Sequence, residues 1–254
     1  MITLKSPREI DLMRRAGRIA AAARALAGGM VAVGVTTGRI DREVREYIVS
    51  EGARPAFLGY GGFPKSVCIS VNDEVIHGIP GKRALREGDV VSIDVGAEKD
   101  GFIGDCAATY IVGEGAEEAR KLAEAARESF FEALRFAKAG CRVSDISRAV
   151  QAAAEGRGFS VVRDFVGHGV GREMHEPPEI PNYVEEPRRG ADPRLLAGMT
   201  IAIEPMVNAG AAAVKVLADG WTVVTSDGRL SAHYENTVLI TGGAPEILTA
   251  HEAM

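Results

Sequence analysis

The sequence predicts an α+β fold built from two related halves. One observation is a strand-like hairpin over residues 90–112, which indicates antiparallel β structure. Another is the order of elements, since a long helix, a shorter helix and then strands occur twice along the chain. The third is a weak internal repeat at a spacing of 106 residues, in which residues of the first half recur in the second. The matching pairs are Gly34 and Gly140, Ile40 and Ile146, Arg42 and Arg148, Val44 and Val150, and Gly52 and Gly158.

Length, composition and charge limit the classes of protein to consider. The 254 residues, 46% hydrophobic and 26% charged, are ordinary for a globular protein with a substantial core. The net charge of −5 gives no reason to expect binding to nucleic acid or to an anionic membrane. No apolar run approaches the ~20 residues of a membrane span, and no signal peptide is evident. Because Cys68, Cys106 and Cys141 are odd in number and widely spaced, a reducing compartment is favoured, and we expect a cytoplasmic protein.

The first half should contain two helices and then strands. Ser6-Pro7-Arg8-Glu9 is a capping box with proline at the first helical position, and the helix that it opens should end near Gly28-Gly29. A second helix is expected from about residue 37 to 50, where apolar residues recur at helical spacing. A loop rich in glycine and aromatic residues, a strand and a further loop then lead to the hairpin. These segments span residues 57–64, 67–71 and 72–81.

The second half repeats this order. A long helix is expected over 116–138, and Ser144 is expected to cap a shorter one that runs to about Glu155. A strand, a loop rich in histidine and glycine, and a Pro-rich loop over 177–193 follow. Because core-like strands resume directly after these loops, the chain is interpreted as a single domain with halves at 1–113 and 114–254. The strands of this half are expected at residues 161–166, 200–207, 212–217, 222–225 and 235–240.

The hairpin places two carboxylates close together. If Asp100 and Gly101 form its two-residue turn, Asp94 lies opposite Ala107. Asp105 is then the diagonal cross-strand neighbour of Asp94, on the same face of the hairpin. Like charges so close in a strand are unfavourable, which favours a compensating divalent metal. The alternative is that both carboxylates lie on the solvated face of an edge hairpin. Aliphatic neighbours argue against that alternative, namely Ile93, Val95 and Ile103.

Three residues of the second half are candidate partners for the hairpin aspartates. Glu204 lies in an apolar strand just before Pro205, Glu235 opens the last strand, and His168 lies where glycines allow close approach of a ligand. Singly, each has an ordinary explanation as an ion-paired glutamate or a structural histidine. Together, four carboxylates and one imidazole suit first-row divalent ions. Two such ions would balance the negative charge of the four carboxylates. A pair of divalent ions is the arrangement found in dimetal hydrolases.

Two more histidines lie near these segments. His77 follows an apolar strand and His175 lies in a loop, so each is either a surface group or, beside a metal, a donor to a substrate carbonyl or amine. His233 and His251 have no comparable context. The sequence contains no GxSxG, HExxH, GxGxxG or P-loop motif, and Cys68 lies in a strand-like run that favours a buried apolar role.

Five stretches of the chain match the motifs of one enzyme family, in the same order. They are SVCISVNDEVIHGIPG (Ser66 to Gly81), SIDVGAEKDGFIGDCAATY (Ser92 to Tyr110), FVGHGVGREMHEPPEIPNY (Phe165 to Tyr183), MTIAIEPMV (Met199 to Val207) and DGWTVVTSDGRLSAHYENTVLIT (Asp219 to Thr241). On these residues the sequence resembles the short bacterial type I methionine aminopeptidases over essentially its full length.

The resemblance implies the pita-bread fold of the creatinase and aminopeptidase proteins, in which two pseudo-symmetric αβ halves surround a central antiparallel sheet. It implies two divalent ions per chain (Co, Mn, Fe or Zn), with a bridging hydroxide that attacks the scissile carbonyl while Glu204 shuttles a proton. His77 would contact the substrate near the scissile nitrogen, and His175 would polarise the carbonyl. A site for Na⁺ or K⁺ near Asn72, Glu74 and Ser231 occurs in some relatives. The implied ligands of the divalent ions are Asp94, Asp105, His168, Glu204 and Glu235.

The implied reaction removes the initiator methionine from proteins whose second residue is small. Nascent polypeptide N-termini, met at the ribosome or after release, are the implied partners; the family precedent is a monomer, and no nucleic-acid or membrane partner is expected. The chain departs from the family at several positions, because members often have Cys, His and Tyr in place of Phe57, Gly61 and Phe63. Phe is common at Met174 and Gln at His233. These changes keep the methionine pocket apolar. Its implied lining is Phe57, Tyr60, Phe63, Cys68, Met174 and Trp221, and His77 and His175 complete the implied substrate-binding residues.

Two alternatives remain open at this point. Aminopeptidase P and prolidase share the fold and the five ligands, but they usually carry an additional N-terminal domain, for which residues 1–26 leave no space. Trp221 and the aromatic residues of segment 60–63 also favour methionine. A non-catalytic binding homologue is less favoured, because all five ligands and both catalytic histidines are present.

Overall fold

The computed structural model describes residues 2–185 and 192–250. The helices are α1 (Pro7–Gly29), α2 (Thr37–Ser50), α3 (Glu117–Leu134) and α4 (Val143–Gly156), with a short 3-10 helix, η1 (Tyr60–Gly62). The strands of the first half are β1 (Arg54–Pro55), β2 (Cys68–Val71), β3 (Glu74–Ile76), β4 (Val90–Lys99) and β5 (Phe102–Ile111). Those of the second are β6 (Ser160–Val161), β7 (Gly167–Gly169), β8 (Glu176–Ile180), β9 (Thr200–Ile203), β10 (Met206–Asn208), β11 (Val214–Val216), β12 (Val223–Thr225), β13 (Ser231–His233), β14 (Glu235–Leu239) and β15 (Glu246–Ile247).

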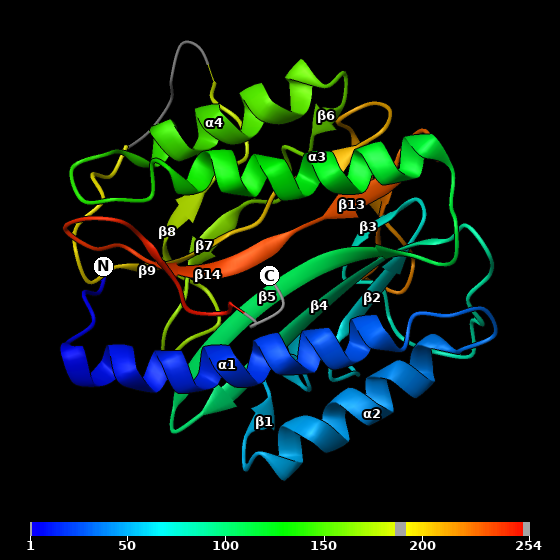
Figure 1. Ribbon diagram of the computed structural model, residues 1–254, viewed down its shortest axis with the longest axis horizontal. Helices are drawn as coiled ribbons and strands as arrows, with labels where there is room; N and C mark the ends of the chain where they lie inside the picture. Colours follow the sequence, from blue (N-terminus) through cyan, green and yellow to red (C-terminus); the bar gives the residue numbers. More distant parts are fainter. Residues whose placement is uncertain (1, 186–191, 251–254) are drawn as a thin grey trace.

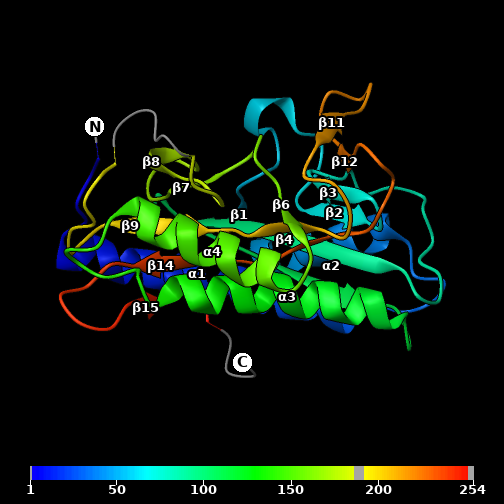
Figure 2. The same ribbon diagram turned by 90° about the horizontal axis from the view of Figure 1, so that it is seen from above.

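A nine-stranded antiparallel sheet forms the centre of the described structure (Figure 1). Its strand order is β1-β4-β5-β14-β9-β7-β8, with β2 paired to β4 and β15 to β14. In Figure 2, β3, β11 and β12 and the β7–β8 hairpin project on one side, while α3 runs along the opposite side. This arrangement confirms the predicted α+β class with a central antiparallel sheet.

The β4–β5 hairpin has the predicted register. Asp94 pairs with Ala107 and Gly96 with Asp105 along the ladder. Asp100 and Gly101 both have positive φ, at 55° and 77°, which is the two-residue turn whose twist suits a hairpin. On the helix side, α1 crosses this hairpin so closely that a Cβ added at Gly104 would lie 2.5 Å from the Cα of Gly17. Glycine at 104 therefore permits the contact between helix and sheet, and glycine at 17 leaves room for the backbone of Leu248.

The predicted repeat has a structural counterpart. The α4 helix begins and ends 106 residues after α2, and the apolar faces of the two helices are equivalent, with Ile40 and Val44 matched by Ile146 and Val150, all fully buried. Each helix packs into its own core, one beneath β4 and β5 and the other beneath β9 and β14. The division into halves at 1–113 and 114–254 stays a prediction.

Several sequence predictions were wrong in detail. Ser144 does not cap α4: the N-cap is Arg142, whose amide donates to the Asp145 carboxylate at 2.8 Å, while the Ser144 hydroxyl donates to Asp192. The long helix α3 ends at Leu134 rather than at 138. The strand expected over 161–166 is reduced to β6, which ends at Val161. Hydrophobic periodicity, from which these boundaries were predicted, does not show the caps and the distant contacts that set them.

The segments predicted as a His-Gly-rich loop and a Pro-rich loop contain two strands. Gly167–Gly169 is β7, which pairs with β9 and with β8, and β8 includes Pro177 and Pro178. Their composition favours loops, but tertiary pairing overrides it, and proline is tolerated because β8 lies at the edge of the sheet. Within the described residues, no helix is both long and apolar enough to cross a bilayer.

Candidate metal centre

Five adjacent strands of the central sheet each bring one predicted ligand to the same region. In sheet order these strands are β4, β5, β14, β9 and β7. Asp94 and Glu235 both pair with Ala107, so they point to the face that Asp105 also shares. Glu204 directly follows β9 where Pro205 interrupts the strand, and His168 pairs with Ala202, two residues before Glu204. These predicted ligands are Asp94, Asp105, Glu235, Glu204 and His168.

His168 is at the centre of the cluster. Its Nε2 lies 3.8 Å from Oδ2 of Asp105 and 3.5 Å from Oε1 of Glu204. The donor atoms of Asp105, His168 and Glu235 all lie within 4.8 Å of one another. The Nδ1 of His168 is 2.9 Å from the carbonyl oxygen of Gly169. When Nδ1–H donates to that carbonyl, the lone pair of Nε2 faces the carboxylates, as in metal-binding histidines.

The carboxylates are too buried and too close to be charged together without a cation. Burial, followed by the neighbouring carboxylates, raises the pKa of Asp94, Glu204 and Glu235 well above its usual range, and burial raises the pKa of Asp105 to about 7. Among the described residues, Oδ1 of Asp94, Oδ1 of Asp105 and Oε1 of Glu235 are buried without a hydrogen-bond partner. The edge-hairpin alternative is therefore wrong for Asp105, which is 3% exposed.

The donor set fits divalent metal ions. Oxygen atoms without partners in a buried site have the chemistry that a hard or borderline cation satisfies, and the cation would remove the like-charge repulsion. Burial lowers the pKa of His168 to about 4, so its imidazole is neutral at pH 7 and able to coordinate. The same residues are consistent with two ions, because Glu235 also belongs to a second close group of three donors.

The raised pKa values predict how the stability of the metal-free protein depends on pH. A carboxylate whose pKa is higher in the folded state than in the unfolded state contributes stability at low pH, and this stability is lost as pH rises through the folded pKa, about 7 for Asp105. Buried imidazoles with lowered pKa act in the opposite direction, but only below their unfolded pKa of 6.5. Above pH 6.5 the carboxylates therefore determine how the stability of the metal-free protein changes with pH.

We expect the melting temperature of chelator-stripped protein to fall by roughly 5–10 °C between about pH 6.5 and about pH 8.5. Thermal unfolding followed by circular dichroism checks this, and adding a divalent metal should flatten the slope. A melting temperature that rises over this range in metal-free protein would contradict the like-charge cluster.

A cavity of about 150 Å³ lies directly above the cluster. Its walls are mainly apolar, with Phe63 packed edge-to-face on Trp221 at 5.2 Å between ring centres. All six residues of the predicted methionine pocket line it: Phe57, Tyr60, Phe63, Cys68, Met174 and Trp221. Ile76, Phe165 and Val166, which the sequence did not single out, line it as well. Burial and the nearby carboxylates raise the pKa of the Cys68 thiol, so it acts there as a small apolar group.

His77 and His175 both line the cavity. His77 has a positive φ of 59° and its ring lies edge-on to Trp221, 6.2 Å away; burial lowers its pKa to about 4. The ring of His175 is 4.3 Å from that of His168. Its Nδ1 lies 2.6 Å from the hydroxyl oxygen of Tyr60, and partial burial lowers its pKa. Both imidazoles are therefore neutral at pH 7.

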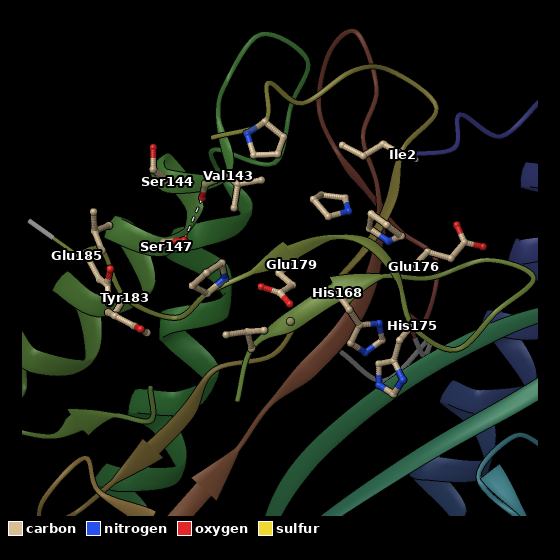
Figure 3. A pocket seen from close by; sticks show the side chains of 17 residues that line it. Ile2, Val143, Ser144, Ser147, His168, His175, Glu176, Glu179, Tyr183 and Glu185 are labelled. Carbon is tan, nitrogen blue, oxygen red and sulfur yellow. Dashed lines mark hydrogen bonds between the residues drawn. The ribbon is translucent and has the colours of Figure 1, made fainter. Parts of the chain in front are cut away.

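A larger groove of about 910 Å³ runs away from the same point. It shares Val166, His168 and His175 with the cavity and continues between the β7–β8 hairpin and α4. Figure 3 shows His168 and His175 side by side at one end of this groove, with Ser144 on α4 at the other. The cavity thus forms a closed apolar end beside the cluster, and the groove forms an open channel that leads away from it.

Sequence reasoning missed one buried polar residue at the cluster. His233 is 2% exposed, and its Nε2 lies 3.6 Å from Oε2 of Glu204 and 3.9 Å from Oε2 of Glu235. The available signal was its position two residues before Glu235. That signal was ambiguous, because Tyr234 separates β13 from β14 and the two strands belong to different sheets, so alternation cannot be carried from one to the other. His251 lies outside the described residues.

Comparison with known proteins gives consistent matches over the whole chain. The model of metallopeptidase family M24 matches residues 11–242. Methionine aminopeptidase of Clostridium perfringens is 54% identical over 98% of this chain and 99% of its own length. The crystal structure of methionine aminopeptidase from Thermotoga maritima superposes with a TM-score of 0.95 at 46% identity, covering 99% of this chain and 100% of that one. Prolidase from Pyrococcus furiosus matches with a TM-score of 0.79 at 25% identity, and this chain spans 66% of its length.

Proposed function

The chain belongs to metallopeptidase family M24 and is a methionine aminopeptidase, and we propose that the buried carboxylate–imidazole cluster is its catalytic centre. Its fold is the pita-bread arrangement of that family. One observation carries the proposal: five adjacent strands place buried acidic and imidazole donors at the floor of an apolar cavity of the size of a side chain. Neither a structural metal site nor a simple ion-pair network accounts for that cavity.

The chain binds divalent metal, and the proposed ligands are the same five residues that the sequence singled out. When bound, two divalent ions would lower the pKa of a water molecule and stabilise the negative charge that develops on the substrate carbonyl. Co, Mn, Fe and Zn all suit a set of carboxylates and imidazole. The ligands are Asp94, Asp105, His168, Glu204 and Glu235. A site for Na⁺ or K⁺ is proposed where the Ser231 amide donates to the carbonyl of Asn72, beside Glu74.

The side chains around the cavity take the remaining roles. Glu204 is proposed to accept the proton lost by the attacking water and to pass it to the leaving amine, because its carboxylate lines the cavity beside the other proposed ligands. If Tyr60 O–H donates to Nδ1 of His175, the proton of the imidazole is on Nε2, from which it is donated to the scissile carbonyl oxygen. His77, which is neutral and also lines the cavity, would contact the scissile nitrogen.

The cavity and the groove suit the two sides of the scissile bond. The unbranched thioether of methionine fits a narrow cavity lined by Phe63, Trp221 and Met174, where sulfur–aromatic contacts add to apolar burial. The open groove beyond His175 would accommodate the rest of the polypeptide. A small second residue is proposed because the cavity meets the groove beside His168 and His175, whose rings lie 4.3 Å apart and leave little space there.

Nascent or newly released protein N-termini are the proposed substrates, including those still at the ribosome. Each residue proposed for the site comes from a single chain, which supports a working monomer. Cys68, Cys106 and Cys141 are all free thiols, which supports a cytoplasmic location.

A peptidase acting before proline is disfavoured, since prolidase shares the fold at only 25% identity, against 54% for the methionine aminopeptidase of Clostridium perfringens. We propose methionine specificity because aromatic and Met side chains close the cavity around an apolar first residue. A non-catalytic binding role is disfavoured by the buried carboxylates without partners, which a binding surface does not need.

Methionine release from a Met-Ala-Ser peptide tests the proposed function. Chelator-stripped protein is titrated with Mn, Fe, Co or Zn, and an Ala-Pro peptide is run in parallel. We expect metal-restored cleavage of the Met peptide alone. Cleavage only before proline would move the chain to the aminopeptidase P branch, and no cleavage with any metal would support the binding homologue.

A further inference from the structure

His233 is held rigidly at the edge of the proposed centre. It ends β13, and its Cα is paired with that of Met206 in β10. The hydroxyl of Thr109 in β5 accepts a hydrogen bond from the His233 amide at 2.9 Å and donates one to the His233 carbonyl at 2.8 Å. The backbone position is therefore fixed from two neighbouring strands, and the imidazole, 2% exposed, has little freedom to move away.

The Nε2 atom of His233 has no hydrogen-bond partner among the described residues. It faces Oε2 of Glu204 at 3.6 Å and Oε2 of Glu235 at 3.9 Å, both longer than a hydrogen bond. These spacings nearly match the 3.5 and 3.8 Å that separate Nε2 of His168 from its own carboxylate neighbours. Ligands ~2.0–2.2 Å from a shared tetrahedral ion lie roughly 3.3–3.6 Å apart. The geometry that makes His168 a candidate ligand therefore applies to His233 as well.

The donors form two groups of three that share one carboxylate. One group is Asp105, His168 and Glu235, and the other is Glu204, His233 and Glu235, each with donor atoms within 4.8 Å of one another. Glu204 lies between the two imidazoles, with Oε1 toward His168 and Oε2 toward His233. We propose that His233 is a second imidazole ligand of the metal centre, so that each of the two groups contributes one nitrogen donor.

This assignment rests on the proposed function and changes the chemistry of its centre. A donor set of four carboxylates and a single imidazole would favour binding of Mn²⁺, whereas a second imidazole favours Co²⁺, Fe²⁺ or Zn²⁺. His233 would then be a residue that selects the metal. Loss of the His233 imidazole should weaken binding of Co²⁺, Fe²⁺ or Zn²⁺ much more than binding of Mn²⁺.

Proton NMR of the Co²⁺-loaded wild-type protein tests the proposal directly. Each Co²⁺-bound imidazole that retains its other N–H gives a strongly shifted signal that disappears in D₂O. We expect two such signals in the wild type, one in His233→Gln and one in His168→Gln. His175→Gln is the matched control: its ring also borders the site, but it is not a proposed ligand, so both signals should persist.

Calorimetric titration of the stripped proteins provides a second measurement. We expect His233→Gln to bind Zn²⁺ or Co²⁺ at least about 10–100-fold more weakly than the wild type, with a much smaller change for Mn²⁺. One shifted signal in the wild type, or unchanged Zn²⁺ and Co²⁺ affinities in His233→Gln, would overturn the ligand role and leave the five-ligand centre standing. A wild type that binds no divalent metal at all would overturn the proposed centre and this inference with it.

Discussion

Asp105→Asn is expected to lose metal binding and to lower kcat/KM by about 10³-fold or more. The change keeps the shape of the side chain but removes a carboxylate that lies between Asp94 and His168 at the centre of the cluster. Loss of a residue that only supports a ligand typically costs about 10–100-fold, and loss of a ligand should cost more. Metal content of purified protein by mass spectrometry and methionine release from Met-Ala-Ser check both effects.

A stability measurement separates this result from misfolding. In the metal-free protein, Asp105→Asn removes one member of a buried cluster of like charges, so its melting temperature at about pH 8 should rise above that of stripped wild type. Asp100→Asn is the matched control, because it makes the same chemical change in the exposed turn of the same hairpin, where its pairing with Arg15 at 3.7 Å is weak. Full activity and metal content in Asp105→Asn would show that the ligand assignment is wrong.

The parts of the fold that the sequence predicts well are those set by local chemistry. The α1 helix begins and ends as predicted because its capping box and terminal glycines lie within the segment itself. The β4–β5 register was predicted to the residue because an Asp-Gly turn and strict alternation determine it together. This register alone placed Asp94 and Asp105 on one face.

The parts that the sequence does not predict depend on pairing between distant segments. Gly167–Gly169 has the composition of a loop, and it is a strand only because β9 and β8 lie on either side of it. The role of His233 depends in the same way on where β13 meets Thr109 of β5, more than a hundred residues earlier. The hydrogen bond of Tyr60 to His175, likewise, connects two loops that no periodicity relates.

The order of strands explains why the site lies where it does. β4 and β5 belong to the first half, β9 and β7 to the second, and β14 returns at the end of the chain to lie between β5 and β9. Insertion of β14 brings carboxylates from both halves onto one face, with Glu235 next to Asp105 on one side and Glu204 on the other. The centre therefore forms only when the two halves are joined, so local unfolding of β14 would release the metal.

His175→Ala is expected to lower kcat by about 10²–10³-fold while metal content stays unchanged. The reason is that its proposed contribution, a hydrogen bond to the developing oxyanion, is made mainly in the transition state, and loss of one such donor typically costs that much. KM for Met-Ala-Ser should change little, because the proposed methionine contacts are made mainly by the aromatic residues and Met174, whereas His175 is proposed to contact the carbonyl. Steady-state kinetics with metal analysis of the same sample check this.

The Tyr60→Phe variant tests how much of the contribution of His175 to catalysis depends on the orientation and tautomer of its imidazole. The hydroxyl of Tyr60 is 2.6 Å from Nδ1 of His175, and the proposed donation by this hydroxyl would keep the imidazole proton on Nε2. Its removal should lower kcat by roughly tenfold, less than loss of the ring, because the free imidazole still samples the productive tautomer part of the time. The two changes combined should cost little more than His175→Ala alone, since Tyr60 acts through His175. Additive losses in the double variant would contradict this coupling, and loss of metal from His175→Ala would instead make His175 a ligand.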